Sequence, residues 1–173
     1  MSTVPPSMVG RLAAEIRPRT AVWLDPALEA IRAALDPRAR WTEPDEAKIL
    51  VLRAPRVSLN GTIEPPDRSA LSRSVVAGPG ATAADPAPPR VIAVALLDGE
   101  PPDRIVARCR GPIRAQRVIC EQAVLDVIHD ELVIVELARG VSARDLQARV
   151  EPTLLVSPRV KEMVATAPPA IVE

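Results

Sequence analysis

Aromatic residues are nearly absent from this sequence. Its 173 residues include no Phe, no Tyr and only two Trp, although hydrophobic residues make up 47% of the chain. The core must therefore be built from Val, Ile, Leu and Ala, a composition that favours a β-sheet covered by Ala-rich helices. A chain of this length can bury about two thirds of its unfolded surface, so it needs no disulfide or metal to stabilise a core.

Cysteine and histidine are also scarce, which limits the chemistry that the sequence can support. Cys109 and Cys120 are too few for a disulfide framework or a metal site, so we expect two buried, reduced thiols and no metal. His129 is the one histidine. Because no second histidine and no nucleophile lie near it in the sequence, we interpret it as a residue of a surface turn rather than as a catalytic base.

Neither sign of charge predominates, with 22 basic and 22 acidic residues. This balance argues against the positive surface typical of proteins that bind nucleic acid or anionic membranes. No apolar run approaches the roughly 18 residues of a membrane-spanning helix. The N-terminal sequence has neither the basic start nor the apolar centre of a signal peptide. We therefore predict no nucleic-acid partner, no membrane partner and a cytoplasmic location.

The first half of the chain predicts alternating helices and strands. Met8, Leu12 and Ile16 have the spacing of one helix face. Ser7 is the expected N-cap of that helix, and Asp25 is the expected N-cap of a second helix, which begins with proline. The expected elements are a helix at 7–17, a strand at 20–24, a helix at 26–35 and strands at 38–42 and 48–52. Their short connections predict parallel strands.

The second half of the chain predicts two hairpins and a buried strand. Asn60-Gly61 is a strong signal for a type I′ turn, in which both residues have positive φ. Apolar runs around Asp130-Glu131 predict the second, antiparallel hairpin, and Ser142 is expected to cap a helix after it. The other expected elements are a short helix at 69–76, a loop at 77–89, a buried parallel strand at 91–97 and an edge strand at 152–156.

Short motifs of the last third of the chain occur in a recognisable order. They are C-x-x-P-[IL] at 109–113, A-V-x-D-V at 123–127 and V-E-L-A-x-G-V at 135–141. This order resembles the C-terminal region of the B (β) subunits of 3-oxoacid and 3-oxoadipate CoA-transferases. A looser, collinear resemblance extends upstream through 90–109, 48–64 and 8–24. A section of the family's middle region has no counterpart in this shortened, divergent chain.

The resemblance implies a fold and a setting. The fold is α/β: an open, mostly parallel sheet with flanking helices and a C-terminal antiparallel hairpin, as in CoA-transferases and NagB/RpiA-like proteins. It occupies one domain over residues 1–173, with 1–6 and 161–173 frayed. An A-like partner subunit completes the active site. Acyl-CoA and a carboxylic acid are the substrates, so coenzyme A is a substrate and no cofactor is bound permanently.

The resemblance also points to a catalytic residue. In the family, one glutamate of the B subunit attacks the thioester with its carboxylate, and it lies in a Ser-Glu-Asn-Gly motif after a strand. The collinear place here is 41–45, Trp-Thr-Glu-Pro-Asp, which makes Glu43 the candidate nucleophile. Pro-Asp replaces the expected Asn-Gly, so the alternative interpretation of Glu43 is a solvated loop carboxylate.

Further candidates for ligand binding are glycines and arginines. Gly78 and Gly80 are collinear with a Gly-rich turn near the family's CoA site, so they are candidates for cofactor binding, with a flexible turn as the alternative. Spaced arginines are interpreted as a solvated strand face or a contact with an acidic partner, and alternatively as a site for the CoA phosphates: Arg104, Arg108, Arg110, Arg114 and Arg117. Glu136 is interpreted as a solvent-facing or interface charge.

Two functions are consistent with these residues. The first is a B-like subunit of an enzyme that transfers CoA between carboxylic acids, or hydrolyses CoA thioesters as some members of the family do. The second is a shortened paralogue that keeps the scaffold and the subunit interface and serves as a structural or regulatory partner. The missing section and the altered glutamate motif favour the second function. The closing motifs argue for retained folding and leave catalysis open.

Overall fold

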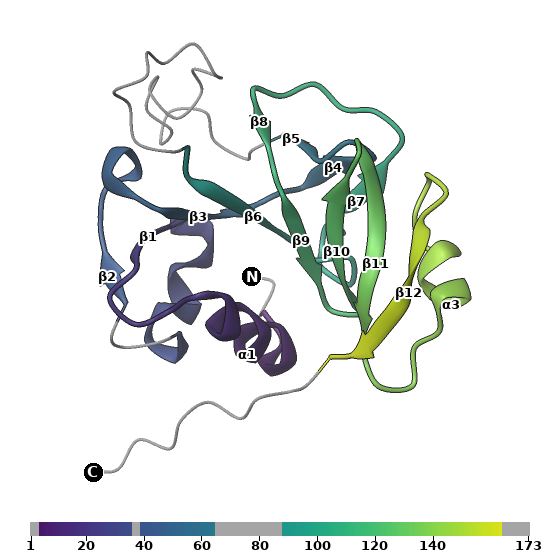
Figure 1. The fold of residues 1–173 in the computed structure, drawn as a ribbon, viewed down its shortest axis with the longest axis horizontal. Coiled ribbons are helices and arrows are strands. Elements are labelled where there is room, and N and C mark those ends of the chain that lie inside the picture. Colours follow the sequence, from purple (N-terminus) through teal and green to yellow (C-terminus); the bar gives the residue numbers. More distant parts are fainter. Residues whose placement is uncertain (1–3, 36–38, 65–87, 164–173) are drawn as a thin grey trace.

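The computed structural model describes residues 4–35, 39–64 and 88–163. Within these ranges, eight strands form one open sheet and four short strands form a second sheet beside it (Figure 1). None of the described helices is long and apolar enough to cross a membrane.

The elements have the following bounds. The large sheet contains β1 (Ala21–Leu24), β2 (Arg40–Trp41), β3 (Ile49–Arg53), β6 (Arg90–Ala95), β9 (Arg117–Cys120), β10 (Ala123–Ile128), β11 (Glu131–Leu137) and β12 (Leu155–Glu162). The small sheet contains β4 (Arg56–Ser58), β5 (Thr62–Glu64), β7 (Arg104–Val106) and β8 (Ile113–Arg114). The helices are α1 (Pro6–Glu15), the 3₁₀ helices η1 (Pro26–Ala34) and η2 (Pro44–Glu46), and α3 (Ala143–Gln147).

The large sheet is mostly parallel. Its strand order is β12-β11-β10-β9-β6-β3-β1-β2, and the five strands from β9 to β2 pair in parallel. The β10–β11 hairpin is antiparallel and β12 pairs in parallel with β11. This arrangement confirms the predicted fold class. Because β2 and β3 lie on opposite sides of β1, the order of the strands reverses there, which is the kind of position where open α/β sheets bind ligands.

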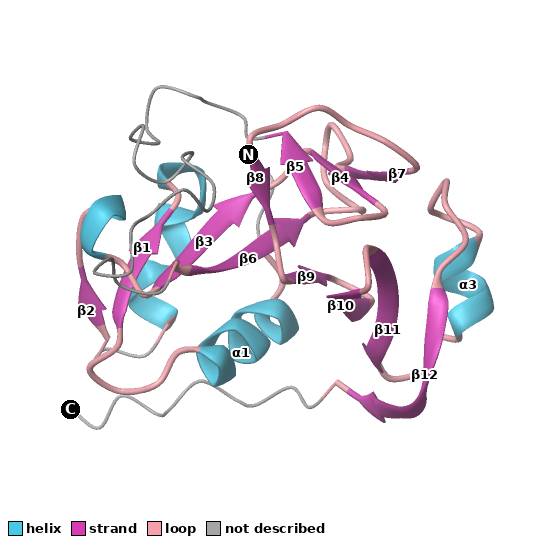
Figure 2. Ribbon diagram, turned by 45° about the horizontal axis from the view of Figure 1, so that its top comes forward, coloured by secondary structure: helices cyan, strands magenta, loops and turns pink. Residues whose placement is uncertain are grey.

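Both faces of the large sheet are covered, as the alternation of β3 illustrates. Ile49 and Val51 belong to the hydrophobic cluster that includes α1 and η1. Leu50 and Leu52 belong to the cluster that includes the small sheet. Successive side chains of a strand point to opposite faces, so α1 and the small sheet pack on opposite sides of the large sheet (Figure 2). The buried side chains are mainly aliphatic, as the composition predicts.

The helix starts differ in part from the predictions. Asp25 caps η1 as predicted, because its Oδ1 accepts a hydrogen bond from the Ala27 N–H at 2.8 Å, although η1 is a 3₁₀ helix. Ser7 is not the N-cap of α1, and that prediction is wrong. The helix begins at Pro6, after Pro5, without a side-chain cap. Proline suits the first helical turn because the N–H that it lacks has no partner inside the helix.

Both predicted hairpins form, but the type I′ conformation occurs in the other one. Of Asn60 and Gly61, only Gly61 has positive φ, and three residues connect β4 to β5. The Asn60 Oδ1 accepts hydrogen bonds from the Ser58 hydroxyl at 2.6 Å and the Thr62 N–H at 3.1 Å, which fixes this alternative turn. Positive φ at two consecutive turn residues occurs instead at His129 and Asp130, which connect β10 to β11.

The chain after β11 is ordered further than the sequence indicates. Ser142 caps α3 in a capping box: its hydroxyl accepts from the Asp145 N–H at 3.2 Å, and the Asp145 carboxylate accepts from the Ser142 N–H at 2.9 Å. The predicted edge strand is β12, and it extends to Glu162. Lys161 and Glu162 were assigned to a frayed tail, but they pair with Glu136 and Leu137 of β11.

We expect Gly61→Ala to destabilise the protein more than Gly140→Ala. Both glycines have a φ of 79°, which costs an L-residue about 1 kcal/mol or more. At Gly140 an added Cβ has nothing within 4 Å, whereas at Gly61 it would lie 2.6 Å from the Ala115 carbonyl oxygen and 2.7 Å from Val127 Cγ2. Urea denaturation of both variants measures the difference. Equal losses in free energy of unfolding would show that the turn at Gly61 relaxes freely.

Candidate functional site

The carboxyl ends of four parallel strands lie along one edge of the large sheet. Glu43 comes two residues after β2, Asp25 directly follows β1, and Arg53 ends β3. Asp103 reaches the end of β6, where its carboxylate accepts a hydrogen bond from the Leu96 N–H at 2.7 Å. Ligands of open α/β sheets bind outside this edge, so it is the place to look for a site.

Glu43, the predicted nucleophile, is exposed at this edge. It lies at the N-terminal end of the one-turn helix η2, where its side chain forms no capping hydrogen bond. Pro44, which replaces the expected Asn, is buried and occupies the first position of that helix. In the chain by itself, Glu43 is therefore a hydrated carboxylate. A carboxylate nucleophile needs a desolvated setting and donors for the oxyanion, which this surface of the described chain does not supply.

Two buried carboxylates hold neighbouring strand ends together. Asp25, at the end of β1, accepts from the Arg53 N–H at 3.1 Å through its second oxygen. Asp103 pairs with the Arg53 guanidinium at 3.2 Å and also accepts from the Leu96 N–H. Both acids are at most 7% exposed. Sequence reasoning did not identify these interactions of Asp25 and Asp103 with Arg53. The local signals for them were an aspartate directly after a strand and the acidic loop before Asp103.

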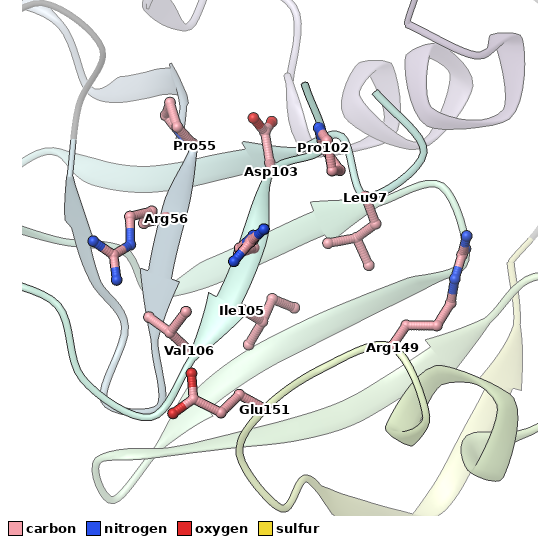
Figure 3. A pocket seen from close by; sticks show the side chains of 10 residues that line it. Pro55, Arg56, Leu97, Pro102, Asp103, Ile105, Val106, Arg149 and Glu151 are labelled. Carbon is pink, nitrogen blue, oxygen red and sulfur yellow. The ribbon is translucent and has the colours of Figure 1, made fainter. Parts of the chain in front are cut away.

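An open cleft lies at the same edge, between the small sheet and the loop after β6. Its volume is about 860 Å³. The walls come from β4, β7, the loop and the segment that follows α3 (Figure 3). Its charged lining residues are Arg56, Asp103, Arg104, Arg149 and Glu151. Glu43 does not line this cleft, so the predicted nucleophile and the cleft are two separate features.

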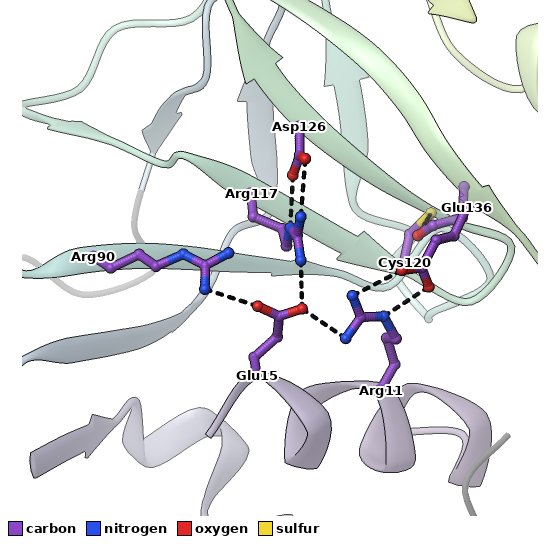
Figure 4. A network of polar contacts seen from close by, with 8 residues as sticks. Arg11, Glu15, Arg90, Arg117, Cys120, Asp126 and Glu136 are labelled. Atoms are coloured by element: carbon purple, nitrogen blue, oxygen red, sulfur yellow. Dashed lines mark hydrogen bonds and ion pairs between the residues drawn. The ribbon is translucent and has the colours of Figure 1, made fainter. Parts of the chain in front are cut away.

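A network of six charged side chains lies between α1 and the large sheet (Figure 4). It joins three arginines to three acids: Arg11, Arg90, Arg117, Glu15, Asp126 and Glu136. Glu15, at its centre, contacts Arg11 at 2.6 Å and Arg90 at 2.8 Å, and also pairs with Arg117. Burial by itself raises the pKa of Glu15, but the three guanidinium groups outweigh it and hold that pKa below its ordinary value.

The network corrects two interpretations from the sequence. Arg117 was assigned to a solvated strand face or a contact with an acidic partner, but its side chain is only 17% exposed and its guanidinium binds Asp126 at 2.6 and 2.9 Å. Its hydrogen bonds to Asp126 raise its pKa further, against the effect of burial. Glu136 was interpreted as a solvent-facing or interface charge, but it accepts two hydrogen bonds from Arg11, at 2.7 and 2.8 Å. These groups stabilise the fold by pairing with one another.

The remaining predicted residues are dispersed. His129 is exposed in its turn, as predicted. Cys120 is buried, which raises its thiol pKa to about 12 and makes it a poor nucleophile. Cys109 is only half-buried, contrary to the prediction, and its thiol donates to the Thr62 carbonyl oxygen at 3.0 Å. Gly78 and Gly80, like the helix expected at 69–76, lie outside the described residues.

No group of three or more His, Cys, Asp or Glu side chains that could hold a metal ion occurs in the part of the chain that the structure describes. Of the five arginines singled out in the sequence, Arg114 pairs with Asp130 and donates to the Asn60 carbonyl oxygen at 2.9 Å. Arg104, Arg108 and Arg110 are exposed.

Comparison with known proteins places the fold. No protein-family model and no curated protein sequence matches the chain. Glutaconate CoA-transferase from Acidaminococcus fermentans superposes with a TM-score of 0.65 at 10% identity, over 96% of this chain and 92% of its own. The acyl-CoA transferase YdiF from E. coli O157:H7, in a thioester complex with CoA, gives 0.66 at 12% identity, over 97% of this chain and 44% of its own. This chain has the CoA-transferase fold.

The predicted fold is thereby confirmed. A third similar structure, a variant of the decarboxylase AibA/AibB, has a TM-score of 0.64 at 13% identity, over 94% of this chain and 90% of its own. One fold therefore supports both transfer and decarboxylation among these neighbours. The reaction must be argued from residues of this chain.

Proposed function

We propose that this chain is a B-like subunit of a CoA-transferase-family enzyme, which acts on acyl-CoA thioesters together with an A-like partner subunit. The supporting observation is the position of Glu43. It is an exposed carboxylate after a parallel strand, at the ligand-binding edge of a sheet whose fold is shared with CoA-transferases. A single domain over 1–173, a cytoplasmic location and the hetero-oligomeric state belong to the same proposal.

Glu43 is the nucleophile of the proposed reaction. One of its carboxylate oxygens attacks the thioester carbonyl carbon, and the C–S bond breaks to give an acyl-glutamyl anhydride and CoA thiolate. The thiolate then attacks the glutamyl carbonyl, which releases the donor carboxylate and leaves a glutamyl-CoA thioester. The acceptor carboxylate attacks this thioester and expels the thiolate. Attack of the thiolate on the acyl carbonyl of the new anhydride forms the second acyl-CoA and frees Glu43.

The partner subunit supplies what this surface lacks. Docking over the end of β2 would remove water from Glu43, and the desolvated carboxylate would then be a stronger nucleophile. Donors for the oxyanion must also converge on the thioester oxygen. Gly78 and Gly80 remain candidates for this role or for contact with CoA, a proposal that rests on their place in the sequence.

A second candidate function is a non-catalytic partner in such a complex. The one-turn helix η2 favours it, because Pro44 and Asp45 in this helix replace the Asn-Gly of the family motif, and the Glu43 side chain before them forms no capping bond. In that case the chain keeps the sheet and the interface, and supports the activity of another subunit. Thioester hydrolysis is a variant of the first function in which water replaces the acceptor carboxylate.

Co-expression with an A-like subunit tests the proposal, and an open reading frame beside that of this chain is the first source to try. We expect the two chains to co-purify, and the complex to convert one acyl-CoA into another when a carboxylic acid is added, whereas neither chain does so alone. Release of free thiol without an acceptor identifies hydrolysis. A stable complex without either activity supports the scaffold function. Failure of the chains to associate contradicts both.

A further inference from the structure

Two arginines of the cleft lie side by side on its wall. β4 and β7 pair in parallel with Arg56 opposite Arg104, and the Arg104 N–H donates to the Pro55 carbonyl oxygen at 2.8 Å. Neighbouring strands are about 4.8 Å apart, so the two side chains start close together on one face of the small sheet. Like charges in this arrangement repel each other, and an anion bound between them would remove that cost.

The lining leaves Arg104 without a counterion. Arg56 has Glu64 at 3.6 Å, but both side chains are about half exposed, so water screens the pair. Asp103, the buried acid beside Arg104, is occupied by Arg53 and the Leu96 N–H. Among the described residues, no carboxylate lies within 4.0 Å of the Arg104 guanidinium. Arg104 is therefore a cation that faces the cleft unpaired.

The rest of the cleft lining is partly apolar and closely packed. Ile105, Val106 and Leu97 line the cleft and are 2%, 5% and 8% exposed, so its floor belongs to the packed part of the molecule. The Glu151 N–H donates to the Ile105 carbonyl oxygen at 3.1 Å, which ties the far wall to β7. A volume of about 860 Å³ can hold a molecule of nucleotide size, since ligand sites commonly span about 300–1,000 Å³.

We propose that this cleft is a phosphate-binding site in which Arg104 and Arg56 hold a phosphoryl group. The planar guanidinium matches two phosphate oxygens at once, and two such groups on adjacent strands can hold a phosphate dianion between them. The shared chemistry covers inorganic phosphate and the phosphate of a nucleotide-like ligand. The site is separate from Glu43, which follows β2 beyond β1 and β3, and it stands whether or not the proposed reaction is correct.

Binding measurements on the full chain test this site. Inorganic phosphate, pyrophosphate and adenosine 3′,5′-bisphosphate are titrated by calorimetry against the wild type, Arg104→Gln, Glu151→Gln and Arg139→Gln. We expect Arg104→Gln to weaken binding by roughly tenfold or more, because it removes a charge-assisted hydrogen-bond donor. Arg139 is exposed and does not line the cleft, so Arg139→Gln controls for the lost charge and should change affinity by less than about twofold.

The other variants and the comparison of the three anions identify the ligand and define the results that would overturn the proposal. Glu151→Gln removes an opposing charge from the lining and should strengthen binding by about twofold. Much tighter binding of the bisphosphate than of inorganic phosphate indicates a nucleotide-like ligand, and equal binding indicates a simple phosphate site. The proposal is wrong if none of the three anions binds the wild type, or if a folded Arg104→Gln, checked by circular dichroism, binds them equally well. Glu43→Ala should leave this binding unchanged, which separates the site from the proposed reaction.

Discussion

Replacement of Glu43 by alanine is expected to reduce CoA transfer by the complex of this chain with its A-like partner by roughly a thousandfold or more. Loss of a nucleophile abolishes the covalent route, and the remaining rate comes from substrate binding alone. Formation of the second acyl-CoA measures the rate. Without an acceptor, the wild-type complex should also accumulate a glutamyl-CoA adduct that mass spectrometry locates at Glu43 and that the variant cannot form.

Glu46→Gln is the matched control for this experiment. Glu46 is exposed in the same turn, and its carboxylate accepts a hydrogen bond from the Thr42 hydroxyl at 2.9 Å. It has no part in the proposed chemistry, so the rate should stay within about twofold of the wild type. If Glu43→Ala forms the complex and transfers CoA at the wild-type rate, Glu43 is not the nucleophile. In that case the chain has the scaffold function, or the partner subunit supplies the nucleophile.

The strands of the large sheet were predictable because their signals are local. β3 covers Ile49–Arg53, one residue from the expected 48–52, since a continuous apolar run is typical of a strand covered on both faces. The β10–β11 hairpin was predictable for a similar reason, as two apolar runs flank a polar turn. The position of Glu43 after a strand also follows from local order, and its exposure agrees with the alternative interpretation as a solvated loop carboxylate.

The pairing of β7 and β8 with the predicted β4–β5 hairpin and the ion pairs were not predictable from local patterns. β4 and β7 contain three residues each and pair across about 48 positions, so neither carries enough periodicity to reveal its partner. Arg53 and Asp103 are 50 positions apart, and Arg11 and Glu136 are 125 apart. A charged residue in a strand predicts exposure by default. Glu136 departs from that rule because α1 covers this face of the sheet and brings Arg11 to it.

The same charge network carries a large expected effect on stability. Glu15→Gln should lower the free energy of unfolding at pH 7 by about 3 kcal/mol, because it leaves partly buried guanidinium groups without their shared anion. The Glu15 side chain is 7% exposed, and the side chains of Arg11 and Arg117 are 13% and 17% exposed, so solvent screens these pairs little. Urea denaturation measures the loss. Glu29→Gln is the control, since Glu29 pairs with Arg32 on the surface, and it should cost no more than about 0.5 kcal/mol.

The pH dependence of this loss tests whether the ionised form of Glu15 is its source. Burial raises the pKa of Glu15, but Arg117, Arg11 and Arg90 together lower it below its ordinary value of 4.5. A carboxylate whose folded pKa is depressed stabilises the protein above its unfolded pKa, and this contribution is lost as the pH falls through the folded value. The difference in free energy of unfolding between the wild type and Glu15→Gln should therefore have its largest value at pH 7 and should decrease as the pH falls below 4.5. A difference that stays constant through this acid range would mean that glutamine disturbs packing beside α1, and that the three arginines do not depend on the charge of Glu15.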